Sequence, residues 1–182
     1  MKDLSLNLLD IAENSVKAGA TLTQLLLTQE AGILTFQVVD DGCGMTEEVL
    51  RGVVDPFYTT RTTRKVGMGL PLLRMAAEQT GGTMTVESRH KDAYPDNHGT
   101  VVTAVFHTDH IDCPPVGDMT ATVTTLIQGH PDTDFYFRHV CDGTEVELDT
   151  RALRQILGEV SLAEFEVLQW ITGYLTDQYN GQ

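Results

Sequence analysis

The sequence predicts a two-layer α/β sandwich, with one layer of helices and one of β-strands. Residues 4–17 carry apolar side chains at helical spacing, and a second helical pattern follows Gly69. Four runs rich in β-branched and apolar residues accompany these helices: 21–29, 33–39, 83–88 and 100–107. Helices and strands of this kind bury their apolar faces against each other in two layers.

Length and composition allow one good core with a small appendage. The chain has 182 residues, of which 41% are hydrophobic and 21% charged, as is usual for a globular protein. The net charge of −14 is unevenly spread: residues 1–108 hold nine Lys/Arg against thirteen Asp/Glu, whereas residues 109–182 hold three against thirteen. Nucleic acids and anionic membranes repel such an acidic segment, so we expect neither as its partner.

The cysteines and the N-terminus favour a soluble, cytoplasmic protein. Cys43, Cys113 and Cys141 lie far apart, without a CxxC pair and without metal-ligand spacing to a histidine. An odd number of cysteines without a signal peptide is typical of reduced thiols in the cytosol. The first residues lack the long uncharged core of a signal peptide, and no apolar run reaches transmembrane length.

Residues 4–17 form the first predicted helix, which ends at the glycine of residues 18–20. Asp10, Asn14 and Lys17 are spaced i, i+4 and i+7, so they share one face of that helix. Taken alone, this spacing is typical of a solvated helix flank. Two glycine turns further along the chain favour a functional role for the three side chains instead.

The first glycine turn, Asp40-Asp41-Gly42-Cys43-Gly44, follows the second predicted strand, which pairs with the first through a short hairpin. Glycines at a strand end let backbone N–H groups approach a phosphorylated ligand closely. A carboxylate fixed at the same place can accept a hydrogen bond from an exocyclic amine. A plain turn is the alternative, since Asp-Gly turns are common. The turn therefore favours a nucleotide site.

A lid-like segment, residues 55–65, separates the two glycine turns, after a short helix that Thr46 caps and Gly52 ends. The segment is apolar at its start, where we expect Phe57 to pack against the core. Its later part is rich in hydroxyls and in cations that offer counter-charge to a γ-phosphate, although surface cations often only aid solubility. These cations are Arg61, Arg64 and Lys65.

The second glycine turn, Gly67-Met68-Gly69, opens the helical pattern that stops at residues 81–82. The last two predicted strands follow it and complete the sandwich. The polar loop between those strands holds His90 and His98, which we interpret as surface residues.

The chain contains, in this order, an asparagine-bearing helix, DDGCG, PFYTTR and GMGLPL. This series of motifs resembles the Bergerat-type ATP-binding fold of histidine kinases, DNA gyrase, the heat-shock chaperone and mismatch-repair ATPases. The resemblance covers roughly residues 4–107, and four ordered motifs are far more specific than a lone glycine motif. PFYTTR and GMGLPL are most similar to histidine kinases, whereas ENSVKAGAT is more similar to the mismatch-repair branch.

The resemblance implies a site for ATP with Mg²⁺. It implies that Asn14 helps to hold Mg²⁺ between the phosphates, that Lys17 reaches a phosphate oxygen and that Asp40 binds the adenine amine. Mg²⁺ keeps most of its waters and needs few protein oxygens, so a single amide suffices. The remaining positions that the resemblance assigns to the nucleotide are Gly42, Gly44, Phe57, Thr59, Thr60, Arg61, Arg64, Lys65, Gly67, Gly69 and Leu70.

The chain is expected to divide into a nucleotide-binding domain, residues 1–108, a linker, residues 109–119, and a small acidic α/β extension, residues 120–182. The extension begins with an apolar run over residues 121–128 and contains a β-hairpin with its turn at Asp142-Gly143. We recognise no motif in it.

Two helices are expected after the hairpin. Asp149 caps the first, which ends at Gly158, and residues 161–164 form a capping box for the second. We expect the apolar residues of the second helix to pack as core against the hairpin rather than to form a partner groove. They are Leu162, Phe165, Leu168, Trp170, Ile171 and Leu175.

Three functions are compatible with these residues. Residues 1–14 contain no histidine that could serve as phosphoacceptor. A kinase of this kind would therefore phosphorylate a partner protein, as the stand-alone anti-sigma kinases that it resembles do. An ATPase would use Asp10 to orient the attacking water, as the resemblance to the gyrase and mismatch-repair branches implies. A nucleotide-sensing module would let a partner detect the position of the lid. Phosphate contacts alone do not separate the three.

Overall fold

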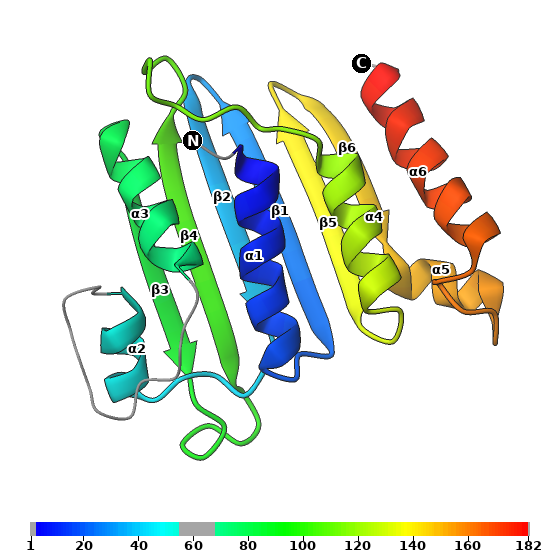
Figure 1. Cartoon of the computed structure of the whole chain (residues 1–182), viewed down its shortest axis with the longest axis horizontal. Helices are drawn as coiled ribbons and strands as arrows, with labels where there is room; N and C mark the ends of the chain where they lie inside the picture. The colour runs from blue at the N-terminus through cyan, green and yellow to red at the C-terminus, as the bar shows by residue number, and fades with distance from the viewer. Residues whose placement is uncertain (1–2, 55–67, 182) are drawn as a thin grey trace.

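The computed structural model describes residues 3–54 and 68–181, and within them the chain forms a six-stranded sheet covered by helices. The strands are β1 (Leu22–Glu30), β2 (Ile33–Asp40), β3 (Thr83–Arg89), β4 (Gly99–His107), β5 (Asp134–Cys141) and β6 (Thr144–Asp149). The helices are α1 (Leu4–Lys17), α2 (Glu47–Val54), α3 (Gly69–Gln79), α4 (Met119–Gly129), α5 (Thr150–Leu157) and α6 (Phe165–Asn180). The strand order is β3-β4-β2-β1-β5-β6, and Figure 1 shows α3, α1 and α4 side by side on one face of the sheet. The predicted two-layer sandwich is confirmed.

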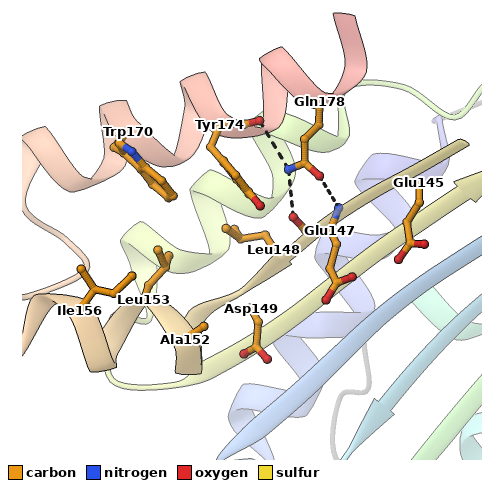
Figure 2. A pocket seen from close by; sticks show the side chains of 10 residues that line it. All are labelled: Glu145, Glu147, Leu148, Asp149, Ala152, Leu153, Ile156, Trp170, Tyr174 and Gln178. Carbon is orange, nitrogen blue, oxygen red and sulfur yellow. Dashed lines mark hydrogen bonds between the residues drawn. The ribbon is translucent and has the colours of Figure 1, made fainter. Parts of the chain in front are cut away.

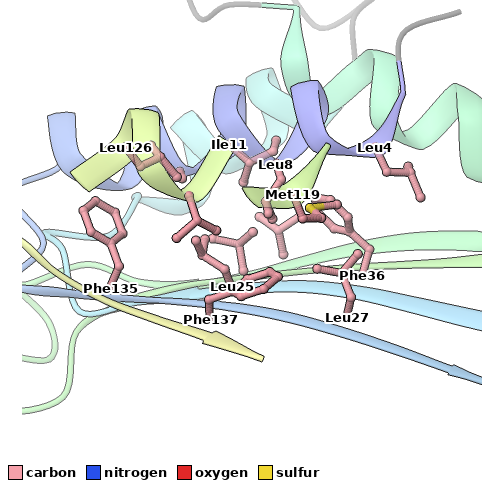
Figure 3. Packing of buried hydrophobic residues seen from close by; sticks show 14 of the residues in the cluster. Leu4, Leu8, Ile11, Leu25, Leu27, Phe36, Met119, Leu126, Phe135 and Phe137 are labelled. Carbon is pink, nitrogen blue, oxygen red and sulfur yellow. The ribbon is translucent and has the colours of Figure 1, made fainter. Parts of the chain in front are cut away.

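Alternate residues of the central strands face the helices and form the core, as a period of two residues predicts. The inward side chains include Leu25, Leu27 and Phe36, none of which is more than 1% exposed. Leu8 and Ile11 of α1 pack against this layer (Figure 3). Each fully buried apolar side chain of this size contributes about 1.5–3 kcal/mol, so the contact fixes α1 across the centre of the sheet.

Tight turns join the antiparallel strands where the sequence places them. Ala31 and Gly32, between β1 and β2, have φ angles of 51° and 80°. Asp142 and Gly143, between β5 and β6, have φ angles of 47° and 90°. Positive φ at both central residues is typical of the type I′ turn, which suits the right-handed twist of paired strands. Both predicted hairpins are confirmed.

The predicted end of α2 is wrong. The helix does not stop at Gly52 but continues to Val54. Val53 is only 4% exposed, and its burial outweighs the cost of about 1 kcal/mol for a glycine inside a helix. The predicted start is confirmed, because the Thr46 hydroxyl accepts a hydrogen bond from the N–H of Val49 at 3.3 Å.

The last helix differs from the prediction in its start and in its exposed face. It begins at Phe165, because Ser161 accepts a hydrogen bond from the Ala163 N–H in a separate turn before the helix. Three of the expected core residues are fully buried: Leu162, Ile171 and Leu175. Phe165 and Trp170 are 71% and 52% exposed, so the prediction that they are core is wrong. The helix packs mostly against α4 and β6, and its Tyr179 also contacts His139 of β5.

Residues 119–181 continue the same sheet. β5 pairs in parallel with β1, and β6 pairs antiparallel with β5. α4, a helix that the sequence analysis did not identify, contacts both α1 and α6. The buried apolar cluster includes residues from both parts of the chain. The boundary expected near residue 108 therefore falls in a loop, and the sheet and the core continue across it.

The segment expected to be a linker packs against the start of α1. The carbonyls of Pro115 and Val116 accept hydrogen bonds from the N–H groups of Leu4 and Ser5, each at 2.9 Å. The first N–H groups of a helix have no acceptor within the helix, so this loop satisfies them. None of the helices that the structure describes is long and apolar enough to cross a membrane.

Candidate functional site

Asp40 ends β2 with its carboxylate held from two sides. Its Oδ2 accepts a hydrogen bond from the Ser15 hydroxyl of α1 at 2.7 Å, and its Oδ1 accepts one from the Gly42 N–H at 2.8 Å. Ser15 is only 3% exposed, so the helix fixes the carboxylate from inside the protein. Among the described residues, no lysine or arginine forms an ion pair with Asp40.

The turn after Asp40 requires its two glycines. A Cβ at Gly42 would lie 2.9 Å from the Cβ of Ala18, at the end of α1. The Cys43 N–H donates to the Ala18 carbonyl at 2.9 Å, which holds the turn in this close contact. Gly44 has a φ of 71°, and a Cβ there would lie 2.0 Å from the Arg89 carbonyl oxygen. Both positions therefore exclude any side chain.

Asp41 has a structural task, unlike its neighbour. Its carboxylate accepts hydrogen bonds from the N–H groups of Thr21 and Leu22, at 2.7 and 3.0 Å, and from the Thr21 hydroxyl. Burial alone would raise the pKa of Asp41, but these hydrogen bonds outweigh that effect and lower the pKa. Asp41 anchors the start of β1, which leaves Asp40 as the candidate ligand-binding carboxylate.

The loop between β3 and β4 closes onto the same turn. Nδ1 of His98 forms a hydrogen bond with the Gly42 carbonyl, and the Lys91 N–H donates to the Cys43 carbonyl at 2.8 Å. The sequence analysis placed His98 at the surface and missed this contact. His98 and Gly42 are 56 positions apart, so no local sequence pattern predicts their contact.

The polar face of α1 extends from the glycine turn to the start of α3. Asp10 lies beside Gly69, the first residue of α3, where a Cβ would be 3.5 Å from the Asp10 Cβ. Asn14, one helical turn further, is partly buried, and Lys17 is exposed at the end of the helix. The structure thus places these three residues along one face that ends next to Asp40.

α3 presents its N-terminus to this face. Within the described residues, Met68 at the N-cap position makes no side-chain capping bond. The first N–H groups of a helix bind anions readily, because they lack internal acceptors and carry partial positive charge. Leu70 is 5% exposed and belongs to the hydrophobic core, so only its backbone can contribute to a ligand site.

Part of the predicted site lies outside the described residues. These positions are Phe57, Thr59, Thr60, Arg61, Arg64, Lys65 and Gly67, and their roles stay predictions. In the stretches that the structure does describe, no group of three or more His, Cys, Asp or Glu side chains is arranged to hold a metal ion.

Comparisons with known proteins agree with the motifs. The family model described as histidine kinase-, DNA gyrase B-, and HSP90-like ATPase matches residues 2–110. The sensor histidine kinase ZraS of Klebsiella oxytoca is 31% identical over 88 residues, which are 48% of this chain and 19% of that protein. Sporulation kinase E of Bacillus subtilis (strain 168) is 30% identical over 88 residues, which are 48% of this chain and 12% of that protein.

Among solved structures, the mycobacterial sensor histidine kinase MprB aligns with a TM-score of 0.40 and 23% identity. The alignment covers 53% of this chain and 64% of the MprB chain. The matched part of this chain spans less than a fifth of the length of ZraS and of sporulation kinase E, at 19% and 12%.

Proposed function

This chain belongs to the family of histidine kinase-, DNA gyrase B-, and HSP90-like ATPases, whose model matches residues 2–110, and from that premise we propose that it binds Mg²⁺-ATP and acts through a partner protein. The observation that carries the proposal is the meeting of α1 with the end of β2. Ser15 of α1 fixes the Asp40 carboxylate, and the same helix leads through Asn14 to the start of α3. One face thus offers three groups to a nucleotide: a hydrogen-bond acceptor for the base, the side-chain amide of Asn14 and the N-terminus of α3.

Asp40 is the proposed contact of the adenine amine. Each carboxylate oxygen has about two lone-pair sites, and the Ser15 and Gly42 donors occupy one on each oxygen. The sites that remain can accept a hydrogen bond from an exocyclic N–H. Because two bonds already fix the carboxylate, little conformational freedom is lost when a base binds.

Asn14 and Lys17 are the proposed contacts of the metal and the phosphates. Mg²⁺ would neutralise charge between the phosphates, held by the Asn14 amide oxygen together with phosphate oxygens and waters. The donors on this face fit such a group, since α1 supplies one amide and one ammonium, and α3 supplies the N–H groups of its first turn. We propose that Arg61, Arg64 and Lys65, outside the described residues, form a lid over the γ-phosphate.

A protein substrate or a protein reader is the proposed partner. Phosphoryl transfer depends mostly on positioning and electrostatics, and the similarity to sensor kinases favours transfer to, or signalling through, another protein. We propose that this takes place in the cytoplasm. The family match ends at residue 110, which supports residues 1–108 as the nucleotide-binding module and residues 120–182 as an added unit.

Slow ATP hydrolysis is the second candidate, and the position of Asp10 favours it. Asp10 of α1 lies beside Gly69 at the start of α3, where it can orient a water near a bound phosphate. Aspartate is one methylene shorter than glutamate, a difference of about 1 Å, and a misplacement of about this size costs on the order of a hundredfold in rate. We therefore expect slow release of phosphate by the chain alone. A nucleotide-sensing module without catalysis is the remaining alternative.

Nucleotide affinity tests the main proposal. Isothermal titration with ATP and GTP, with and without Mg²⁺, should show Mg²⁺-dependent preference for ATP. Asp40→Asn should lose this preference, because an amide can place a donor where an acceptor is needed and leave the adenine amine unpaired. Asp109→Asn is the matched control, since Asp109 is exposed in the loop after β4. Equal affinity of the unmodified chain for ATP and GTP would refute the adenine assignment.

Phosphate release in the steady state separates the two candidates. We expect slow release that Asp10→Ala reduces further and Asp10→Glu accelerates. Rapid release by the unmodified chain, abolished in Asp10→Ala, would make the protein a self-sufficient ATPase. Rapid release that Asp10→Ala leaves unchanged would remove Asp10 from the mechanism.

A further inference from the structure

Polar groups of this protein find hydrogen-bond partners even at the edge of the sheet. Figure 2 shows the Gln178 amide of α6, which accepts a hydrogen bond from the Glu147 N–H at 2.9 Å and donates one to the Glu147 carbonyl at 3.0 Å. The buried hydroxyl of Thr150 donates to the Asp134 carboxylate and accepts from the Phe135 N–H, each at 2.9 Å. Such pairing is general in proteins, because a buried polar group without a partner costs free energy.

Thr23 of β1 departs from this rule. Its side chain is 0% exposed, and its hydroxyl has no hydrogen-bond partner within the part of the chain that the structure describes. Nδ2 of Asn7 and Nε2 of His139 share this property among the described residues. Thr23 differs from both in its place, because it lies directly opposite Asp40 in the ladder between β1 and β2.

Thr23 and Asp40 face the same helix layer. Thr23 alternates along β1 with Leu25, which is buried under the helices, and Asp40 follows the buried Val38 at the same period of two residues. Directly opposite residues of an antiparallel pair have Cβ atoms about 4.5–5.5 Å apart. Ser15 of α1 reaches the Asp40 carboxylate from this layer at 2.7 Å. The Thr23 hydroxyl therefore lies within reach of the carboxylate that we propose as the contact of adenine.

The Asp40 carboxylate has an acceptor site left for such a donor. A carboxylate offers about four lone-pair sites. The Ser15 hydroxyl and the Gly42 N–H occupy two of them, and the adenine amine would take a third. Asp40 is only partly buried, so solvent reaches its remaining sites before a base binds. A base that covers the carboxylate excludes this solvent, and an acceptor that loses water needs a donor from the protein.

We propose that Thr23 is a positioning residue for Asp40: its hydroxyl turns and donates a hydrogen bond to the Asp40 carboxylate when adenine covers that carboxylate. The inference rests on the proposed contact of Asp40 with the adenine amine. Thr23 does not touch the nucleotide and acts through Asp40, which it holds toward the amine. Guanine has a carbonyl where adenine has this amine, so the support favours ATP over GTP. An unpartnered hydroxyl thus lowers the stability of the free chain and raises the selectivity of the bound one.

Thr23→Val separates a functional hydroxyl from an idle one, because valine has nearly the shape of threonine and lacks the donor. It should raise the urea midpoint of the chain without nucleotide, since it removes an unpartnered buried hydroxyl. Thr150→Val is the contrasting variant. It removes a hydroxyl that is equally buried but has two partners, so it should lower the urea midpoint.

Titration calorimetry with ATP and with GTP, both in the presence of Mg²⁺, measures the selectivity. Thr23→Val should weaken ATP binding roughly five- to tenfold and leave GTP binding unchanged. Thr23→Ser keeps the hydroxyl and should restore the preference for ATP. Thr28→Val is the matched control, because it makes the same change at an exposed position of the same strand. It should leave both affinities unchanged.

The results that would overturn the proposal differ from one another. A raised urea midpoint together with unchanged ATP affinity in Thr23→Val would make the hydroxyl idle. Equal weakening of ATP and GTP binding, or a loss that Thr23→Ser does not restore, would assign Thr23 to packing alone. Equal affinity of the unmodified chain for ATP and GTP would remove the adenine contact of Asp40 itself, and the role of Thr23 with it. That last result is seen in the unmodified chain, before any variant is compared.

Discussion

Carboxylates at two strand ends of this molecule have different kinds of partner. At the end of β2, Asp40 accepts hydrogen bonds from the Ser15 hydroxyl and the Gly42 N–H. At the start of β5, Asp134 accepts one from Arg154 at 2.7 Å and another from the Thr150 hydroxyl at 2.9 Å. Neutral donors hold the first carboxylate, whereas an arginine neutralises the second.

The charge of the partner distinguishes Asp40 from Asp134, although Asp41, which neutral donors alone hold at the start of β1, shows that neutral partners do not by themselves make a carboxylate a binding group. A carboxylate paired with arginine has its charge compensated within the fold, and such pairs serve the structure. A carboxylate held only by neutral donors is fixed in position and can still accept a hydrogen bond from a ligand. The three arginines after residue 108 all form ion pairs of this structural kind, with Glu145, Asp149 and Asp134. These ion pairs therefore stabilise the C-terminal region, whereas the carboxylate at the end of β2 can still accept a hydrogen bond from the ligand that we propose.

Removal of the C-terminal region should have the largest effect. In a chain that ends at residue 110, β1 becomes an edge strand, and the N–H groups of Leu4 and Ser5 lose their acceptors. Apolar residues of α1 and β1 lose their contacts with α4 and β5. Each buried apolar side chain contributes about 1.5–3 kcal/mol and a whole domain is stable by only about 5–15 kcal/mol, so cooperative thermal unfolding should be lost.

A chain that ends at Gly158 is the control for this truncation. It keeps β5 and β6 and lacks α6 and the turn before it, which holds the buried Leu162, so it should still unfold cooperatively, at a lower temperature than the full chain. Circular dichroism during heating measures both chains. Cooperative unfolding together with ATP binding by the chain that ends at residue 110 would show that residues 1–108 are an autonomous domain.

Loss of Arg154, the α5 residue that pairs with Asp134 at the start of β5, should have the next largest effect. Arg154 also donates to the carbonyls of Pro131 and Thr133, at 2.6 and 3.1 Å. Partly buried acceptors that lose their donor cost about 1–3 kcal/mol, so Arg154→Ala should lower the free energy of unfolding by about 2 kcal/mol. Arg154→Lys should recover little, because lysine lacks the planar fork of donors. Urea unfolding measures these differences.

Two further variants give unfolding free energies with which the loss in Arg154→Ala can be compared. Arg138→Ala breaks an exposed pair with Glu145 and should cost less than about 1 kcal/mol. Asp40→Asn should change stability by no more than about 1 kcal/mol while it removes the preference for adenine. If Asp40→Asn lowers stability as much as Arg154→Ala, the distinction between a binding and a structural carboxylate fails.

The elements up to residue 107 could be predicted from sequence because their signals are local. Asp40, Gly42 and Gly44 follow an apolar run directly, and the positions of turn and strand agree with the structure. α4 was not identified, because threonine, valine and isoleucine make up much of it and have weak helix propensity. Packing against α1 and α6 supplies its stability instead.

Contacts between distant residues could not be predicted from one sequence. The parallel pairing of β1 with β5 joins Leu22 to Asp134, 112 positions away by their numbers. Local sequence patterns do not predict the contact of His98 with Gly42 either. Trp170 shows a different limit, since the apolar pattern of α6 does not tell which of its sides lacks a neighbour. Such outcomes depend on which elements meet in three dimensions.

The buried histidine of the C-terminal region should give a smaller, pH-dependent effect. His139 is 8% exposed, and its Nδ1 forms a hydrogen bond with the Tyr179 hydroxyl at 2.8 Å. Burial lowers the pKa of His139 below its usual value of about 6.5. The unfolded chain therefore binds the proton first, and the free energy of unfolding falls as pH drops through about 6.5 toward the lower folded-state pKa.

His139→Gln removes the titrating group and should flatten this dependence, measured as urea midpoints from about pH 8 to about pH 5. The matched control is His110→Gln, whose side chain is 40% exposed, and it should keep the slope of the unmodified chain. Identical slopes for His139→Gln and the unmodified chain would assign the pH dependence to other groups. Because Nε2 of His139 has no hydrogen-bond partner among the described residues, protonation has nothing nearby to stabilise it.

The smallest expected effect concerns His98, which contacts the turn after β2. His98 reaches the Gly42 carbonyl from the loop between β3 and β4, whereas the His90 side chain in the same loop pairs with its neighbour Asp92. A single hydrogen bond of this kind contributes about 0.5–1.5 kcal/mol. His98→Ala should therefore weaken ATP binding roughly two- to tenfold, because the turn that fixes Asp40 loses one of its supports. His90→Ala should leave the affinity unchanged.

Titration calorimetry with ATP measures both variants, and urea unfolding shows whether the change is confined to binding. We expect the free energy of unfolding to differ by less than about 1 kcal/mol between them, since His98 is only partly buried. Equal affinities for ATP in the two variants would leave Ser15 and the glycine turn as sufficient supports of Asp40. A loss of stability in His98→Ala as large as that of Arg154→Ala would instead make His98 part of the structural framework, and the end of β2 would then resemble the start of β5.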